Sequence, residues 1–364
     1  MKKIIKCLLC LSLVFAMVFA VGCTGDTSQP PDAEPAPATE AEAPAAPADT
    51  PADTSRTSPY KVGMSVPSAT NTYGVQVLNE AEYAMESSPD VSDFYIVQAD
   101  NNAAKQVADI EDMLAQGVDL LLIQAVNEPA LVPVVQEAMN SGVIVISVSG
   151  LLEEYDASVA SQDFEFGRIG AQWLADTLDG SGNIIVFDGI AGLAVAENRL
   201  AGAMSVFDNY PDMQIVGSEF ASWDFAQGKM AAENMLAANP VIDGVWSCGG
   251  EMTRGAIEAF QAAKRPLIPM MGEDCNGFLK DWKSLIDDPG FDAIATSMPT
   301  WIFSEALDIG LKILNGESVE KDTIIPIPVI TKDNLDDFIR EDLSDAYWAN
   351  SRMSEEMKLE IYGL

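Results

Sequence analysis

Short apolar runs alternate with segments of helical periodicity from about residue 60 onward. The run Leu-Leu-Leu-Ile within residues 119–125 is bounded by polar residues and is apolar at every position, as a strand buried on both faces of a parallel sheet is. The pattern predicts strands at 62–66, 94–98, 119–125 and 143–148, and helices starting at 73 and spanning 103–116 and 129–139. Strict alternation of strand and helix indicates a doubly wound α/β sheet with helices on both faces.

The same alternation starts again after a short run at residues 157–160. It predicts strands at 183–188, 214–219, 244–247, 267–271, 293–297 and 324–330, and helices at 166–178, 193–204, 225–236, 251–263 and 301–314. Two successive α/β units of similar size predict two lobes with a cleft between them. Residues 333–364 are expected to form short amphipathic helices packed at the end of the second lobe.

The stretch at residues 183–204 combines a buried strand, a glycine turn and a helix. The turn Gly-Ile-Ala-Gly at 189–192 follows the strand, and apolar side chains recur on one face of the helix that begins at Leu193. Ligands of parallel α/β sheets bind at the carboxyl ends of strands, where such a turn lies. Arg199 in this helix is therefore either a solvated residue or a clamp for a ligand.

Residues 1–22 have the features of an export signal. Three lysines near the start precede an apolar segment at 7–21, which is short for a permanent transmembrane helix. The segment ends in Ala-Val-Gly-Cys at residues 20–23, which resembles the processing site of bacterial lipoproteins. The resemblance implies cleavage before Cys23, a diacylglycerol on its sulfur and attachment to the outer side of the cell membrane. The alternative is an ordinary signal peptide with an incidental cysteine.

Residues 23–59 form a stretch rich in Pro, Ala and Glu that is nearly free of large apolar side chains. Such a segment buries too little surface to offset its chain entropy, so we expect a disordered tether. Proline and like-charge repulsion keep such a tether extended. It would let a lipid-anchored domain stand off the membrane and still reach a partner there.

The charge and the composition exclude several classes of function. A formal net charge of -36 over 364 residues argues against a nucleic-acid partner and against binding to anionic lipid headgroups. The chain contains no histidine, which removes the commonest general base and the commonest transition-metal ligand. Ser-His-Asp and Cys-His catalysis are therefore impossible. We expect no enzyme, no metal and no cofactor, with carboxylate-only glycoside hydrolysis as the remaining enzymatic alternative.

Five short motifs, in order along the chain, resemble a known family. They are Ser-Val-Pro-Ser-Ala-Thr-Asn-Thr-Tyr at 65–73, Gln-Ala-Asp-Asn-Asn at 98–102, Asp-Leu-Leu-Leu-Ile at 119–123, Gly-Ile-Ala-Gly at 189–192 with Arg199, and Gly-Glu-Asp at 272–274. Over residues 60–330 the chain resembles the ribose/galactose-type, or type I, periplasmic solute-binding proteins of ABC importers.

The resemblance implies a definite architecture. Two Rossmann-like lobes with parallel sheets would be joined by three hinge crossings, near Ser161, Ser297 and Ile327, around a ligand cleft. The N-terminal lobe would comprise residues 60–161 and 298–326. The C-terminal lobe would comprise residues 162–297 and 327–364.

The resemblance also implies ligand-binding positions. Asn71 would hydrogen-bond a hydroxyl group of the ligand, and Tyr73 and Trp223 would stack on it. Arg199 would clamp the ligand, and Asp274 would accept hydrogen bonds from it.

Three further positions of the expected site depart from the family's pattern. Ser149 stands where the family has an aspartate followed by arginine, Gly249 stands where it has asparagine followed by aspartate, and Ser297 is the polar residue at a crossing. The lost bidentate contacts and the added space predict a ligand that is larger or less hydroxylated than a pentose. Carbohydrate remains the leading class.

Each assignment has a structural alternative. Asn71 lies in a turn-prone run, and Tyr73 can anchor the start of a helix on the core. Trp223 directly precedes a residue that resembles a helix cap, and Asp274 can cap the helix that follows it. Glu273 is expected to be solvated rather than a ligand contact.

These features predict a lipid-anchored extracytoplasmic receptor, a monomer that captures a small solute by lobe closure and delivers it to the permease of an ABC importer. The solute is expected to be a sugar. The alternative is a receptor of the same fold for a membrane signalling partner, or for a nucleoside, an amino acid or an autoinducer, and a carboxylate-based glycosidase has less support. The sequence leaves open the ligand, the partner and whether Cys248 and Cys275, expected as thiols, form a disulfide.

Overall fold

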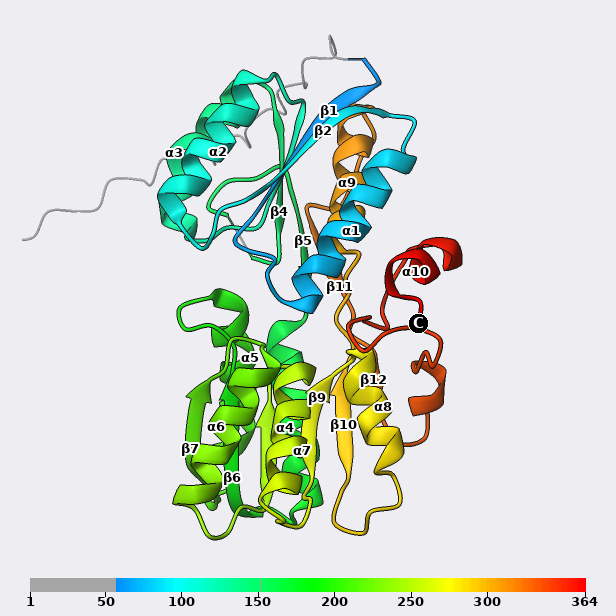
Figure 1. The fold of residues 1–364 in the computed structure, drawn as a ribbon. Coiled ribbons are helices and arrows are strands. Elements are labelled where there is room, and N and C mark those ends of the chain that lie inside the picture. Colours follow the sequence, from blue (N-terminus) through cyan, green and yellow to red (C-terminus); the bar gives the residue numbers. More distant parts are fainter. Residues whose placement is uncertain (1–56, 151) are drawn as a thin grey trace, which may run out of the picture. The chain divides into compact units, whose positions relative to one another are not determined.

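The computed structural model describes residues 57–150 and 152–364. Within them the chain forms two six-stranded sheets, each covered by helices (Figure 1). The predicted signal peptide, Cys23 and nearly all of the predicted tether lie outside the described residues. In the part of the chain that the structure describes, no helix is both long enough and apolar enough to cross a membrane.

The first sheet is parallel throughout. Its strands are β1 (Tyr60–Val66), β2 (Val91–Gln98), β3 (Leu120–Ile123), β4 (Ile144–Val148), β5 (Ala157–Ser161) and β11 (Asp322–Ile325). They lie in the order β11-β5-β4-β3-β1-β2. The helices that cover this sheet are α1 (Thr72–Ser87), α2 (Ala103–Ala115), α3 (Glu128–Asn140) and α9 (Ile302–Leu314).

The central strand β3 shows why these runs are apolar at every position. Leu120 and Leu122 lie in the core beneath α1 and α9, whereas Leu121 and Ile123 lie in the core beneath α2 and α3. Successive side chains of a strand point to opposite faces, and both faces of this sheet are covered (Figure 1).

The second sheet repeats this plan with one antiparallel strand at its edge. Its strands are β6 (Ser181–Asp188), β7 (Asp212–Phe220), β8 (Gly244–Ser247), β9 (Met270–Glu273), β10 (Ala293–Thr296) and β12 (Val329–Ile330), in the order β12-β10-β9-β8-β6-β7. Only β12 runs antiparallel to its neighbour within this sheet. The helices are α4 (Asp163–Thr177), α5 (Ala194–Phe207), α6 (Phe225–Ala238), α7 (Gly250–Ala262) and α8 (Asn276–Ser284). We call the first sheet with its helices lobe 1 and the second sheet with its helices lobe 2. The predicted class, two lobes of doubly wound α/β structure, is confirmed.

The chain passes between the lobes three times: between β5 and α4, between β10 and α9, and between β11 and β12. At the third passage, the prediction of one strand over residues 324–330 was wrong. Pro326 and Pro328 have no N–H group to donate to a ladder, so the apolar run is divided. Its first part joins the sheet of lobe 1 as β11, and its last part joins the sheet of lobe 2 as β12.

Residues 333–364 differ from the prediction of a series of short helices packed on the second lobe. We call residues 338–364 the C-terminal segment. One 3-10 turn, η1 (Leu335–Asp337), precedes it and one helix, α10 (Glu355–Tyr362), ends it, with mainly irregular chain between them (Figure 1). Four of its buried side chains, Leu343, Tyr347, Met353 and Tyr362, form a small core with Tyr83 of α1 in lobe 1. The side-chain amide of Asn276 in lobe 2 donates to the carbonyl oxygens of Leu343 and Ser344. The segment therefore packs against both lobes.

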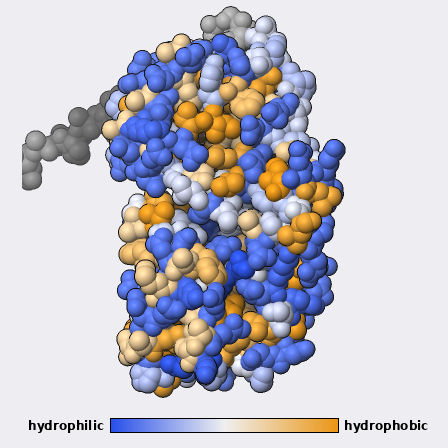
Figure 2. Space-filling view, viewed as in Figure 1, coloured by the Kyte–Doolittle hydropathy of each residue, from blue (hydrophilic) through white to orange (hydrophobic). Residues whose placement is uncertain are grey.

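Apolar residues outside the cores are scattered over the surface. Figure 2 shows hydrophilic side chains over much of the face in view, with apolar ones interspersed. Phe220 at the end of β7 and Met230 in α6 are examples of exposed apolar residues. Apolar residues exposed singly are normal on folded proteins, so they do not by themselves indicate a binding surface.

Candidate functional site

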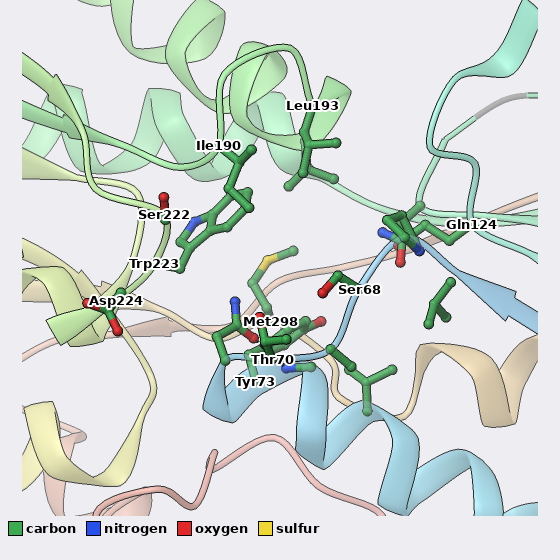
Figure 3. A pocket seen from close by; sticks show the side chains of 18 of the residues that line it. Ser68, Thr70, Tyr73, Gln124, Ile190, Leu193, Ser222, Trp223, Asp224 and Met298 are labelled. Atoms are coloured by element: carbon green, nitrogen blue, oxygen red, sulfur yellow. Dashed lines mark hydrogen bonds between the residues drawn. The ribbon is translucent and has the colours of Figure 1, made fainter. Parts of the chain in front are cut away.

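A cavity of about 260 Å³ lies at the carboxyl ends of the strands of both sheets. Lobe 1 contributes Tyr73 from the start of α1 and Gln124 from the turn after β3 (Figure 3). Lobe 2 contributes Leu193 from the turn after β6 and Trp223 from the turn after β7 (Figure 3). Met298 of the second crossing also lines the cavity. Parallel α/β sheets bind their ligands at this position.

The structure places five of the eight predicted site residues in the lining of this cavity and three outside it. The lining residues are Asn71, Tyr73, Ser149, Arg199 and Trp223. The residues outside the lining are Gly249, Asp274 and Ser297.

Tyr73 is held by its hydroxyl group and by a neighbouring aromatic ring. The hydroxyl donates to the Pro299 carbonyl oxygen in the second crossing at 3.1 Å. The phenol ring lies edge-on to the Trp348 ring, with 5.1 Å between ring centroids. Burial, together with the nearby charge of Glu273, raises the pKa of Tyr73 far above its ordinary value, so the phenol stays neutral. An uncharged ring fixed at two points suits packing against the apolar face of a ligand.

Trp223 occupies a slot that two glycines leave open. Its indole N–H donates to the Cys248 carbonyl oxygen at 3.0 Å. A Cβ atom added at Gly189 would lie 2.2 Å from the indole, and one added at Gly249 would lie 2.6 Å from it. Gly249 therefore serves the site by making room for Trp223, which explains why no larger polar residue stands there.

The backbone at Trp223 is strained. Ser222 and Trp223 both have a φ of 54°, in the left-handed region that side-chain-bearing residues seldom adopt. Such conformations persist only where the surrounding structure imposes them, and they cluster at ligand sites. The next residue, Asp224, caps α6 by accepting from the Gln227 N–H at 2.8 Å. The helix cap at Asp224 and the cavity contact of Trp223 thus occur in adjacent residues of this turn.

Arg199 is a buried ion-pair centre, which excludes the reading of a solvated helix residue. It is 4% exposed, and its guanidinium lies 4.0 Å from the centre of the Phe166 ring. Its Nε donates to Asp163 at 3.0 Å, and one Nη donates to Glu273 at 3.1 Å. The same Nη donates to the Cys248 carbonyl oxygen at 2.9 Å.

Two glycines bring Arg199 close to its partner Asp163. Helices α4 and α5 pack together so tightly that a Cβ atom added at Gly167 would lie 1.7 Å from the Arg199 carbonyl oxygen. One added at Gly202 would lie 2.0 Å from the Phe164 carbonyl oxygen. This approach puts Asp163, the first residue of α4, against the guanidinium of α5.

Glu273 lines the cavity, contrary to the expectation that it is solvated. It ends β9, is only 3% exposed and accepts a hydrogen bond from the guanidinium of Arg199. Burial raises the pKa of Glu273 to about 7, although Arg199 acts in the opposite direction. The cavity therefore contains a carboxyl group whose charge depends on pH near neutrality.

Asp274 and Ser297 form a bonded pair beside the cavity. The Ser297 hydroxyl donates to the Asp274 carboxylate at 2.7 Å, and the backbone N–H groups of Met298 and Asn350 donate to it as well. Burial raises the pKa of Asp274 to about 6 despite these bonds. The pair joins β9 to the second crossing and to the C-terminal segment.

Asn71 and Ser149 lie at loops of lobe 1. The Asn71 side-chain oxygen accepts from the Gly74 N–H at 2.8 Å, so this residue caps α1 as its structural alternative predicted. Ser149 follows β4 with a φ of 54°. Both also line the cavity.

Several lining residues escaped prediction from the sequence. Asp163 and Glu273 adjoin predicted positions, at a crossing and beside Asp274, and this adjacency is the signal in the sequence that could have pointed to them. Trp348 gave no signal, because it lies far along the chain from every predicted strand of the site. Among the described residues no group of three or more Cys, Asp or Glu side chains is arranged to hold a metal. Cys248 and Cys275 are buried thiols.

The chain is similar to known periplasmic binding proteins in sequence and in structure. Residues 62–318 match the family described as periplasmic binding protein domain. The xylitol-binding protein of Mycolicibacterium smegmatis is 28% identical over 264 residues, which are 71% of this chain and 75% of that protein. The ribose import binding protein RbsB of Bacillus subtilis is 28% identical over 275 residues, 75% of this chain and 88% of that protein. The solved fructose-binding periplasmic domain of a hybrid two-component system has a TM-score of 0.66 and 26% identity, covering 76% of this chain and 92% of that one.

Proposed function

Because the chain belongs to the periplasmic binding protein family, we propose that it is an extracytoplasmic receptor that captures a small sugar or polyol and delivers it to an ABC importer. The relatives named for xylitol and for ribose support a polyhydroxylated solute. The single observation that carries the proposal is the cavity, which presents an aromatic ring from each lobe, Tyr73 and Trp223, among polar side chains.

The size of the cavity supports a solute of one ring. At about 260 Å³ it lies near the lower end of ligand pockets, which span roughly 300–1,000 Å³. This volume argues against an oligosaccharide. The sequence predicted a solute that is either larger or less hydroxylated than a pentose. The small cavity supports the less hydroxylated solute more than a much larger one.

The side chains have distinct proposed roles. Tyr73 and Trp223 pack against the C–H faces of the solute, where aromatic rings add both contact area and orientation. Asn71 and Ser149 contact its hydroxyl groups, and Glu273 accepts hydrogen bonds from them. Strong binding of this kind needs few polar contacts if each is held in place.

Arg199 acts mainly through its carboxylate partners. Its guanidinium is committed to Asp163, to Glu273 and to the Cys248 carbonyl oxygen. It therefore orients Glu273 toward the cavity, in addition to any contact of its own with the solute. Asp274 and Ser297 hold the second crossing in place.

Two alternatives differ in support. The likeness to a fructose-binding domain of a two-component system favours a signalling receptor of the same fold as the second candidate. A carboxylate-only glycosidase has less support. Such an enzyme needs an acid and a base or nucleophile on the two sides of the scissile bond, whereas Asp163 and Glu273 both bond one guanidinium.

The remaining elements of the proposal concern the arrangement of the chain. We propose a monomer whose lobes, with the boundaries given above, close over the solute around the three crossings. The lipid anchor at Cys23 and the tether up to residue 59 would keep this receptor near its importer. Detection of a diacylglycerol on Cys23 by mass spectrometry of the exported protein tests the anchor.

A thermal-shift screen tests the solute class. The protein is unfolded and refolded to remove bound solute, then mixed with pentoses, hexoses, polyols, nucleosides and amino acids. A solute at a hundredfold excess over its Kd stabilises the native state by about 2.7 kcal/mol. We expect a shift with a sugar or polyol, and a much smaller one in Trp223→Ala. A shift with nucleosides or amino acids alone would reject the carbohydrate class, and conversion of the solute would reject a pure receptor.

A further inference from the structure

The C-terminal segment reaches the candidate site from outside the part of the chain that matches the family. That match ends at residue 318, and β12 ends at Ile330. Trp348, well beyond both points, nevertheless lines the cavity. Only 3% of it is exposed, and the side chain also belongs to the buried core of lobe 2.

The backbone of Trp348 is bonded to lobe 1 through one side chain. The Gln76 amide in α1 donates to the Trp348 carbonyl oxygen at 3.0 Å and accepts from the Trp348 N–H at 2.8 Å. Gln76 is fully buried, and its amide also donates to the Thr300 hydroxyl at 3.2 Å. Leaving such groups unpaired is costly, which fixes the backbone of Trp348 against α1.

The next two residues are bonded to lobe 2. The Ala349 N–H donates to the Asp274 carbonyl oxygen at 3.2 Å, and the Asn350 N–H donates to the Asp274 carboxylate at 3.0 Å. The Asn350 carbonyl oxygen accepts from the Thr300 N–H in the second crossing at 3.2 Å. Three consecutive residues, 348–350, are thus tied to both lobes and to the crossing between them.

The indole ring is bonded to the start of α1. Its N–H donates to the Thr72 hydroxyl at 3.1 Å. Its plane makes an angle of 79° with the Tyr73 ring, in the edge-to-face arrangement that aromatic pairs favour. Tyr73 lines the cavity as well, so Trp348 contributes to the wall directly and also holds the adjacent aromatic ring.

We propose that Trp348 is a specificity-determining residue of the ligand site. The proposal rests on the proposed solute-binding function and adds a residue that the family match does not include. The indole closes the cavity beside Tyr73 and limits the bulk of the solute on that side. The bonds of residues 348–350 to both lobes keep the indole in place. The accepted solute is therefore a compact sugar or polyol without a bulky substituent at this wall.

Isothermal titration of wild type and three variants tests the proposal. The compact probes are xylitol, D-ribose and myo-inositol, and the bulkier ones are methyl β-D-ribopyranoside and maltose. Trp348→Ala removes the wall, and Trp348→Phe keeps an aromatic ring but loses the bond to Thr72. The control is Tyr362→Phe, which removes the bond from Asn79 to Tyr362 at 3.1 Å and so loosens the same segment away from the cavity.

The expected result is a change in the ranking of the probes. Trp348→Ala should weaken binding of the best compact probe by about tenfold and narrow or reverse its advantage over the bulkier probes. Trp348→Phe should shift the ranking in the same direction by a smaller factor, and it serves alone if the alanine variant does not fold. Tyr362→Phe should keep the wild-type ranking.

Two results would overturn the inference, and only the second would also reject the proposed solute class. An equal loss of affinity for every probe, or an unchanged ranking, in both Trp348 variants would show a structural role only and would leave the proposed function standing. A wild-type protein that binds none of the five probes would reject the sugar or polyol solute and this inference together.

Discussion

Arg199 and Trp223 donate hydrogen bonds to the same acceptor, the carbonyl oxygen of Cys248, at 2.9 and 3.0 Å. One residue is the cation of a buried carboxylate cluster, and the other is an aromatic ring of the cavity wall. Both are therefore fixed to one point of the backbone, directly after β8. A substitution of either residue is therefore expected to alter the position of the other side chain.

Replacement of Arg199 by alanine should destabilise the whole protein. It leaves Asp163 and Glu273 buried without their cation, and breaking a buried ion pair in this way costs about 3–5 kcal/mol. Urea unfolding of Arg199→Ala measures the loss. The control is Arg168→Ala, which removes a half-exposed pair with Glu165 and should cost no more than about 1 kcal/mol. Equal losses in the two variants would contradict the structural role given to Arg199.

Glu273 should make the protein less stable as the pH rises toward neutrality. Its folded pKa of about 7 lies above its ordinary value of 4.5, so the folded state holds the proton more tightly than the unfolded state does. The stability from this proton is fully present below about pH 4.5 and is lost as the pH rises through about 7. Glu273→Gln cannot titrate, so its free energy of unfolding should fall less than that of wild type between about pH 5 and about pH 8.

A control with the opposite sign is available at the surface. The hydrogen bond from Arg168 lowers the pKa of Glu165, so its contribution is present at neutral pH and is lost as the pH falls. Glu165→Gln should therefore leave the decline toward neutral pH intact. Identical pH profiles for wild type and Glu273→Gln would show that Glu273 does not titrate in this range.

Replacement of Gly249 by alanine should weaken solute binding without a direct contact to the solute. The new Cβ atom would lie 2.6 Å from the Trp223 ring and 3.0 Å from Met252, so the indole has to move. We expect a loss of affinity of about tenfold or more, of the size that one misplaced aromatic contact produces. Gly217→Ala in β7 is a matched control, because the atoms nearest to its Cβ atom would be those of the flexible Met235 side chain, at 3.1 Å. Unchanged affinity in Gly249→Ala would show that the position of the Trp223 ring does not determine solute binding.

The two functions of Tyr73 should separate on mutation. Tyr73→Phe keeps the ring and loses the bond to the Pro299 carbonyl oxygen, which should lower the free energy of unfolding by about 1 kcal/mol and leave affinity nearly unchanged. Tyr73→Ala also removes the ring and should weaken binding strongly. Titration calorimetry and urea unfolding of both variants give the comparison. A large loss of affinity in Tyr73→Phe would mean that the hydroxyl group, rather than the ring, serves the solute.

The fold followed from local pattern because its strands are buried on both faces. The run at Leu120–Ile123 has no polar position, as is typical of a strand whose two faces are both covered by helices. The family was also identified correctly, from five short motifs in order along the chain. The run at 324–330 was misread because its prolines divide it between two sheets.

The site was harder to predict because it depends on what the tertiary fold brings together. Glu273 was expected to be solvated, and only the tertiary fold, which brings Arg199 of α5 to the end of β9, shows the ion pair between them. Asp274 was expected in the cavity, but its carboxylate accepts a hydrogen bond from the backbone of Asn350 in the C-terminal segment. No sequence motif in that segment indicated this contact. Trp348 lines the cavity because the C-terminal segment folds back to it, and no hydrophobic periodicity in the sequence predicts that path.

The most direct test of solute binding is isothermal titration of the refolded protein with the sugar or polyol that gives the largest thermal shift. We expect saturable binding with one solute per chain, and recovery of the solute chemically unchanged. Trp223→Ala should lose most of the heat of binding while remaining folded. Absence of saturable binding for every sugar and polyol, with binding of a nucleoside or an amino acid instead, would show that the protein is not a sugar or polyol receptor.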